Sequence, residues 1–79
     1  MNRVRRRKIQ KALEVIDEAR GILEECQEEE SEAYDNMPEW MQEREEGEKM
    51  QDCIDALEEA CESIDELIEN LVDVCELEG

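Results

Sequence analysis

The strongest constraint on the fold of this chain is a heptad repeat in its second half. Apolar side chains recur there at alternating intervals of four and three residues, at Met50, Ile54, Leu57, Cys61, Ile64, Ile68, Leu71 and Cys75. This spacing is typical of an α-helix that packs one face against another helix. A second series with the same intervals overlaps the first, at Cys53, Leu57, Ala60, Ile64, Leu67, Leu71 and Val74. The apolar face is therefore broad enough to contact more than one neighbour.

The first half of the chain carries a similar but less regular pattern. Its apolar residues fall mostly at steps of three and four, at Ile9, Ala12, Leu13, Ile16, Ala19, Leu23 and Cys26, and Val15 and Ile22 widen this stripe. Between the halves, Asp35, Asn36 and Pro38 favour a chain reversal. We therefore predict an all-α fold, an antiparallel helical hairpin forming a single domain. Its helices would span about residues 3–33 and 43–77, with a turn at 34–42. Gly47 leaves open an alternative in which residues 38–43 form a short separate turn and the second helix starts later.

A lone hairpin would leave part of each broad apolar stripe in water. We therefore expect the chain to associate with itself, as a dimeric four-helix bundle or a larger helical oligomer. The expected oligomer core consists of Ile9, Leu13, Ile16, Leu23, Ile54, Leu57, Ile64, Leu67, Ile68 and Leu71. Counting outward from the turn places Ile16 opposite the region of Cys61, and Cys26 opposite that of Cys53. The sequence does not decide whether Cys26 and Cys53 are bonded.

Charge separates the chain into a basic end and an acidic body. The net charge is −17, from 26 acids and nine bases, and six of these bases lie within residues 1–11. An acidic body repels nucleic acids and anionic membranes and attracts basic surfaces. We therefore expect helical acids to mimic a nucleic-acid backbone and bind a basic, nucleic-acid-binding protein, whereas direct DNA binding is not expected. The expected contact residues are Glu24, Glu28, Glu58, Glu62, Asp65 and Glu69.

Two alternatives to this partner-binding function remain open. The basic end and the two aromatic residues near the turn could form an anion site for a small phosphorylated nucleotide. In that case the protein would be an oligomeric sponge, with a site made of Arg3, Arg5, Arg6, Arg7, Lys8, Lys11, Tyr34 and Trp40. The chain could also be a structural coiled coil that binds no ligand.

Several classes of function and location lack their usual sequence signals. The chain has no histidine, no Cys-x-x-Cys and no glycine-rich phosphate loop, so we expect neither an enzyme, nor a metal site, nor a cofactor. No apolar run approaches the ~20 residues of a membrane span, and no apolar segment of a secretory signal follows the basic N-terminus. We therefore expect a cytoplasmic protein.

The turn carries a distinctive motif. Tyr34 is followed by Asp35-Asn36-Met37-Pro38-Glu39, and Gln42 and Gly47-Glu48 come shortly after. This pattern resembles short acidic coiled-coil proteins of Firmicutes phages and prophages, in which a D-N-x-P-E turn joins a basic N-terminal helix to a glutamate-rich one. The resemblance assigns no role to any residue. It implies a phage protein acting in the bacterial cytoplasm against host defence, as an inhibitor or a sponge.

Overall fold

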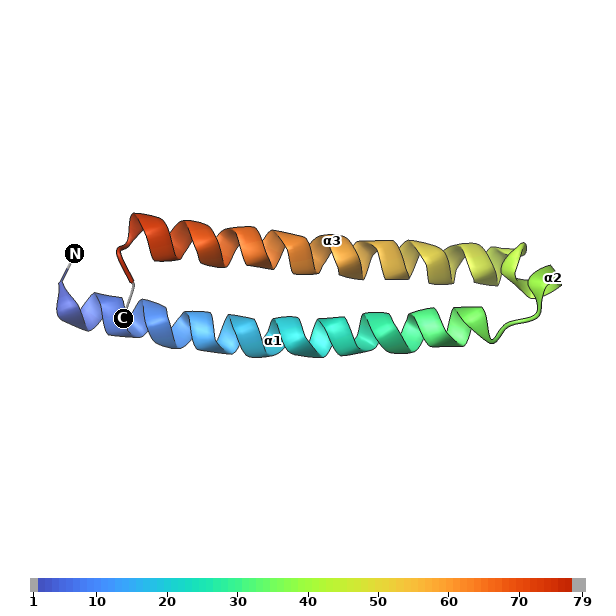
Figure 1. Cartoon of the computed structure of the whole chain (residues 1–79), viewed down its shortest axis with the longest axis horizontal. Coiled ribbons are helices and arrows are strands. Elements are labelled where there is room, and N and C mark those ends of the chain that lie inside the picture. The colour runs from blue at the N-terminus through green and yellow to red at the C-terminus, as the bar shows by residue number, and fades with distance from the viewer. Residues whose placement is uncertain (1, 78–79) are drawn as a thin grey trace.

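The chain forms a long helical hairpin (Figure 1). A computed structural model describes residues 2–77, which contain α1 (Arg3–Asp35), α2 (Glu39–Gln42) and α3 (Glu45–Val74) and no strand. The two long helices run antiparallel and pack against each other over a body measuring 58 × 16 × 15 Å. The prediction of an all-α fold with two packed long helices is confirmed. The connection follows the alternative that Gly47 left open, because the short helix α2 precedes α3.

The turn is closed by backbone and side-chain hydrogen bonds around Pro38. The amide of Asn36, the C-cap of α1, donates to the Glu32 carbonyl, while Pro38 precedes α2 with a φ of −58° and a ψ of 145°. The Gln42 Nε2 atom then reaches back to the carbonyl oxygens of Tyr34 and Met37, at 2.8 and 3.2 Å. A single amide side chain thus links the last turn of α1 to the segment before α2, in addition to the hydrogen bond that the Tyr34 carbonyl accepts from the Met37 amide.

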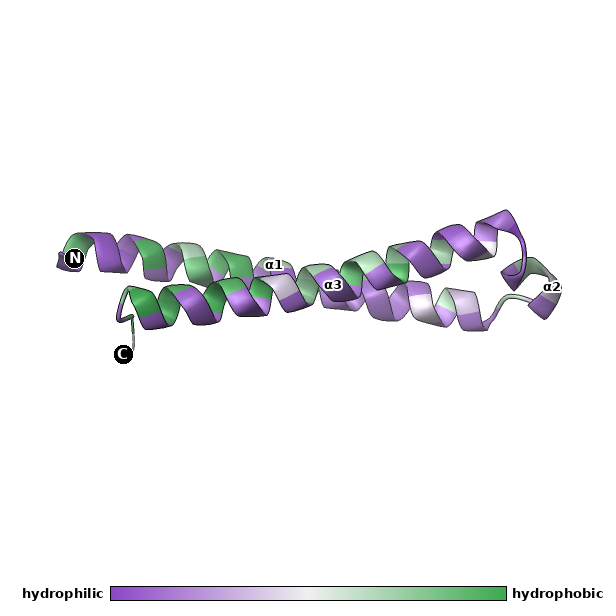
Figure 2. Cartoon of the chain, turned by 90° about the horizontal axis from the view of Figure 1, so that it is seen from above, coloured by the Kyte–Doolittle hydropathy of each residue, from purple (hydrophilic) through white to green (hydrophobic). Residues whose placement is uncertain are grey.

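Each long helix buries one heptad series along the seam between them. On α3 and its C-cap, the buried or half-buried members of this series are Gly47, Met50, Ile54, Leu57, Cys61, Ile64, Ile68, Leu71 and Cys75. On α1 they are Arg6, Ile9, Leu13, Ile16, Arg20, Leu23, Gln27, Glu30 and Tyr34. We call these residues the inward residues. The inward residues of α3 carry no charge, whereas those of α1 include two arginines, a glutamine and a glutamate. Figure 2 shows the result, with hydrophobic residues denser in the half of the hairpin that contains the chain ends.

The open end of the hairpin is closed by a turn after α3. Glu76 adopts a left-handed conformation with a φ of 53°, and the Leu77 amide donates to the Val72 carbonyl at 3.0 Å. This six-to-one hydrogen bond and left-handed residue are typical of a Schellman C-cap. The turn carries Leu77 back onto the hairpin, where it is buried and its carbonyl accepts a hydrogen bond from Gln10 Nε2. With Leu13, Ile54 and Cys61, Leu77 makes up the buried hydrophobic core of the described residues.

The register of the two helices differs from the one predicted. The Cys61 thiol lies 3.9 Å from the backbone oxygen of Arg20, so Arg20 and not Ile16 is opposite Cys61. The prediction was wrong by one helical turn because α1 continues to Asp35 and α2 follows, which moves the reversal toward residue 40. All four cysteines are free, and Cys26 and Cys53 are exposed.

The expected oligomer core divides into inward and outward residues within one chain. Leu13 and Ile54 are buried, and the half-buried members are Ile9, Ile16, Leu23, Leu57, Ile64, Ile68 and Leu71. Leu67 is different, because it is 43% exposed and points away from α1. Val15 and Ile22, which widen the stripe on α1, are also exposed. A single hairpin therefore buries one of the two overlapping α3 series and leaves part of the other in water.

Repulsion between acids should make the stability of the hairpin increase with salt. Within α1 and α3, ten pairs of acids lie four residues apart, where each like-charge pair costs a few tenths of a kcal/mol. Raising NaCl from about 0.05 to about 0.5 M shortens the screening length severalfold. We expect a gain of about 1–2 kcal/mol, or roughly 5–15 °C in Tm, measured by circular dichroism. A Tm that falls over this range would mean that the ion pairs outweigh the repulsion.

Candidate functional site

An open groove runs along one side of the seam between α1 and α3, in the half of the hairpin nearer the turn. Its volume is about 590 Å³. Six carboxylates line it, Glu24, Glu28, Glu32 and Asp35 from α1 and Glu58 and Glu62 from α3. The other lining residues are Arg20, Gln27, Ser31 and Cys61. We call this feature the acidic groove.

The carboxylates converge because both helices place acids at equivalent positions beside the seam. Glu24 and Glu28 on α1 directly follow the inward residues Leu23 and Gln27, and Glu58 and Glu62 follow Leu57 and Cys61 in the same way. In an antiparallel pair, the positions after the inward residues of both helices flank the same edge of the seam. The two acidic stripes therefore form the two walls of one groove.

The six acids expected to contact a partner all lie on this side of the hairpin. The structure places Glu24, Glu28, Glu58 and Glu62 in the acidic groove. Asp65 adjoins it through a contact with Arg20, and Glu69 comes seven residues after Glu62, on the same stripe of α3 but outside the groove. Glu32 and Asp35 belong to the groove although the sequence reasoning did not select them.

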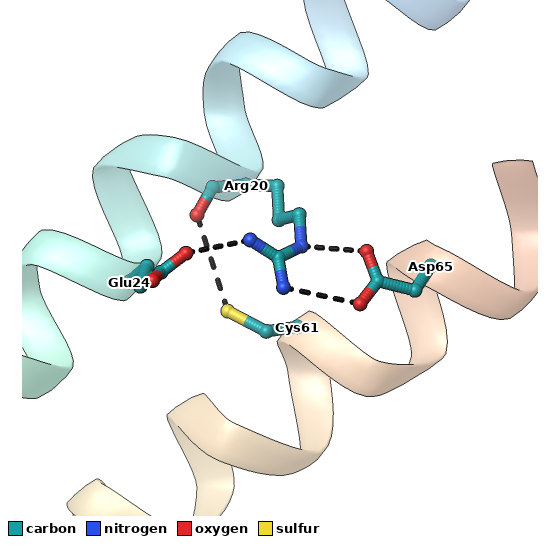
Figure 3. Close-up of polar contacts among 4 residues, drawn as sticks. All are labelled: Arg20, Glu24, Cys61 and Asp65. Atoms are coloured by element: carbon teal, nitrogen blue, oxygen red, sulfur yellow. Dashed lines mark hydrogen bonds and ion pairs between the residues drawn. The ribbon is translucent and has the colours of Figure 1, made fainter.

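Arg20 bridges the two helices at the end of the acidic groove that lies farther from the turn (Figure 3). Its Nε and Nη2 atoms donate to the two carboxylate oxygens of Asp65, at 2.6 and 3.0 Å, and its Nη1 atom donates to Glu24 Oε2 at 2.6 Å. These hydrogen bonds, first to Asp65 and then to Glu24, raise the pKa of Arg20 above its usual value. The guanidinium thus stays charged while it neutralises one acid from each helix.

The sequence contains a signal that Arg20 faces α3, but a search for apolar residues alone misses it. Arg20 lies four residues after Ile16 and three before Leu23, so it continues the inward series of α1. A cation at such a position can reach acids on the facing helix beside the seam. Among the residues lining the acidic groove, all within the described part of the chain, Arg20 is the one cation. Nearer the turn, the groove is lined by acids and by no basic residue.

One chain does not bring together the residues of the alternative nucleotide site. The bases of residues 3–11 lie at the open end of the hairpin, where Arg6 pairs with Glu76 at 3.5 Å and Lys11 with Glu14 at 3.8 Å. Tyr34 and Trp40 lie at the turn, at the other end of the 58 Å body. The Trp40 ring is covered by the guanidinium of the nearby Arg44, whose Cζ atom lies 5.0 Å from the ring centroid. A site made of these residues would need a second copy.

A second depression lies on the same side of the seam, toward the chain ends. It measures about 500 Å³ and is lined by Gln10, Leu13, Glu14, Asp17, Ile68, Val72 and Leu77. Its floor is apolar and belongs to the core that Leu77 closes. It brings together none of the residues that the sequence reasoning selected for binding.

The described residues present a charged surface. Among residues 2–77, no group of three or more histidine, cysteine, aspartate or glutamate side chains is arranged to hold a metal ion. Over the same residues, neither long helix has a segment of the length and hydrophobicity that crossing a bilayer requires. No family model, curated protein or solved structure matches the sequence.

Proposed function

We propose that this protein is a non-enzymatic interaction protein that binds a basic surface of another protein through its acidic groove. The observation that carries the proposal is the convergence of six carboxylates from two helices on one open groove, with Arg20 as the cation among them. A concave row of like charges raises the local potential and attracts cations of complementary arrangement.

The charge density of the groove supports a partner that normally binds nucleic acid. Arg20 is opposite Cys61, so the groove extends from the level of Glu62 to Asp35, a distance of about 23 Å at 1.5 Å per residue. Six carboxylates, less the one that Arg20 neutralises, give five net negative charges over that distance, or one per about 4.6 Å. This is of the same order as the ~3.4 Å of helix axis per phosphate along one strand of duplex DNA. A surface built to bind phosphates would meet a similar spacing of negative charge.

The resemblance of the turn to phage proteins narrows the proposed partner to a host protein. A nucleic-acid-binding protein of bacterial defence is the partner class that combines a basic surface with a reason for a phage to block it. Under this proposal the protein acts in the bacterial cytoplasm as an anti-defence inhibitor and is itself a dimeric four-helix bundle.

The test is capture of a partner from bacterial lysate with a matched pair of variants. The groove variant combines Glu24→Gln, Glu28→Gln, Glu58→Gln and Glu62→Gln. The control variant combines Glu18→Gln, Glu25→Gln, Glu59→Gln and Glu66→Gln, four exposed acids outside the groove. Both variants lose the same charge, so only the position of that charge differs.

We expect the groove variant to bind the captured protein at least about tenfold more weakly, and the control to retain most of the affinity. Duplex or single-stranded DNA should displace the wild-type protein from its partner, and about 0.5 M NaCl should dissociate the complex. Equal losses in the two variants, or a complex that survives this salt concentration, would rule out the groove as a nucleic-acid mimic.

A further inference from the structure

The side of the hairpin opposite the acidic groove has an uncharged stretch in its middle, and charged residues at positions 5, 8, 29, 46 and 49 flank it. On α1 it presents Ala12, Val15, Ala19, Ile22 and Cys26, and on α3 it presents Cys53, Ala56, Ala60, Ser63, Leu67, Asn70 and Val74. We call these residues the uncharged face. None of them is Asp, Glu, Lys or Arg, although 44% of the residues of the whole chain are. All are exposed except Ala60, which is half-buried.

The position of this face follows from the same rule that places the groove. Each of its residues directly precedes an inward residue, as Val15 precedes Ile16 and Leu67 precedes Ile68. The groove acids directly follow inward residues. The positions before the inward residues of two antiparallel helices flank one edge of the seam, and the positions after them flank the other edge. The uncharged face is therefore continuous across both helices and lies opposite the acidic groove.

Four large side chains on this face remain in water in a single hairpin. Val15, Ile22, Leu67 and Val74 are 54%, 56%, 43% and 72% exposed. Small residues separate them, since alanines stand at positions 12, 19, 56 and 60. Alternating large and small side chains can interdigitate with a similar surface.

We propose that a second copy of the chain packs on the uncharged face, head-to-tail, and that the two faces form the centre of a four-helix bundle. A partner for this face must itself present a long, apolar and uncharged surface, and the same face of another copy meets that requirement through a two-fold axis. This interface is independent of the acidic groove, which stays open on the outside of the dimer.

The size of the face fits a dimer of moderate affinity. From Cys53 to Val74 it is about 32 Å long at 1.5 Å per residue, and the hairpin is about 16 Å wide. The footprint is therefore about 500 Å² for each copy, or about 1,000 Å² in total, at the lower end of specific interfaces. We expect dissociation in the micromolar range.

The distribution of charge selects the head-to-tail orientation. Arg20 and Cys61 mark the middle of the hairpin. The half nearer the turn, residues 21–60, has 16 acids and two bases, for a net charge of −14. Residues 2–20 and 61–77 have nine acids and seven bases, for a net charge of −2. A head-to-head dimer would place the two −14 halves together, whereas a head-to-tail dimer places each of them toward a −2 half.

The extent of the uncharged face locates the two-fold axis. The two copies cover most of this face when the axis passes through the middle of its α3 part, between Cys53 and Val74, at the level of about residue 18 on α1. This position places residues 3–11 opposite about residues 25–33 of the partner. The bases of one copy then approach the partner's Glu25 and Glu29, whereas the groove acids lie at the other edge of the seam. The basic end thus has an electrostatic role in assembly.

The first test measures the oligomeric state by sedimentation equilibrium between about 1 and 200 µM, a range that brackets a micromolar dissociation constant. The wild type should be a dimer in the upper part of this range. The double variant Val15→Glu/Leu67→Glu should remain a helical monomer, since both side chains are outward in the single hairpin. Asn36→Glu/Gln51→Glu is the matched control, because it adds the same two charges at exposed residues outside the uncharged face. A monomeric wild type, or a double variant that dimerises as tightly as the control, would overturn the interface.

The second test measures the orientation with one spin label near the turn of each copy. Asn36→Cys provides the label site, with Cys26, Cys53 and Cys75 changed to alanine and the buried Cys61 retained. The head-to-tail dimer places the two labels about 55 Å apart, because residue 36 lies about 27 Å from the axis. A head-to-head dimer would bring them within about 25 Å, and that distance would overturn the proposed orientation.

Discussion

Gly47→Ala is expected to destabilise the hairpin by about 1–3 kcal/mol, the usual cost of forcing an extra methyl group into a packed site. A Cβ atom at this position would clash with the backbone oxygen of Gln42 and would lie 2.5 Å from its carbonyl carbon and 2.6 Å from its Cα. These atoms end α2, and the Gln42 side chain is itself hydrogen-bonded to the end of α1. No rotamer change can relieve a clash with backbone atoms, so α2 and the start of α3 must separate. Urea denaturation followed by circular dichroism measures the loss.

Gly21→Ala is the matched control for this substitution, with the opposite expected sign. Gly21 is also in a long helix, but a Cβ atom there would meet no atom within 4 Å apart from its chain neighbours and the nearby backbone of its own helix. Alanine in place of glycine in a helix interior should then stabilise the hairpin by up to about 1 kcal/mol. If Gly47→Ala proved as stable as Gly21→Ala, the close approach of α2 to α3 would be wrong.

Leu13→Ala and Ile54→Ala are each expected to cost about 2–4 kcal/mol, because truncating a buried aliphatic side chain removes its burial energy and leaves a cavity. Leu13 is 9% and Ile54 8% exposed, and they are two of the four buried core residues. Small domains have only about 5–15 kcal/mol of stability, so either change should remove a large fraction of the total. Thermal unfolding should shift downward by more than about 10 °C.

Val4→Ala provides the comparison for the core substitutions. Val4 is 62% exposed near the start of α1, and its truncation should change the stability by less than about 0.5 kcal/mol. The comparison should be made at one protein concentration, since association also stabilises the folded state. If a core variant had the same Tm as Val4→Ala, the substituted residue, Leu13 or Ile54, would not be packed in the seam.

The sequence predicted α3 more completely than α1, and the reason lies in the inward residues. Every inward residue of α3 is uncharged, so its heptad spacing is visible from hydropathy alone. On α1 the same spacing is interrupted by Arg6, Arg20, Gln27 and Glu30, and a pattern of apolar residues misses those positions. The regular intervals of three and four persist on both helices when polarity is set aside.

Helical spacing alone predicts which acids of the candidate site share a face on each helix, but it does not predict that the two helices bring these acids together. Acids four residues apart must share one face, which places Glu24 with Glu28 and Glu58 with Glu62. That these two pairs face each other depends on the register, and the register depends on the geometry of residues 36–44, which hydropathy does not encode. The bidentate contact between Arg20 and Asp65 follows from that register and was therefore missed.

The polar inward residues of α1 make the two halves of the hairpin unequal in local stability. Toward the chain ends, Ile9, Leu13 and Ile16 meet an apolar helix and Leu77, whereas toward the turn the inward positions 27 and 30 are glutamine and glutamate. Local unfolding begins where buried apolar contacts are fewest, so the segment beside the turn should separate more often than the rest. The acidic groove occupies that segment. A cationic partner that fastens both walls together would therefore also hold closed the part of the molecule that hydrophobic packing secures least.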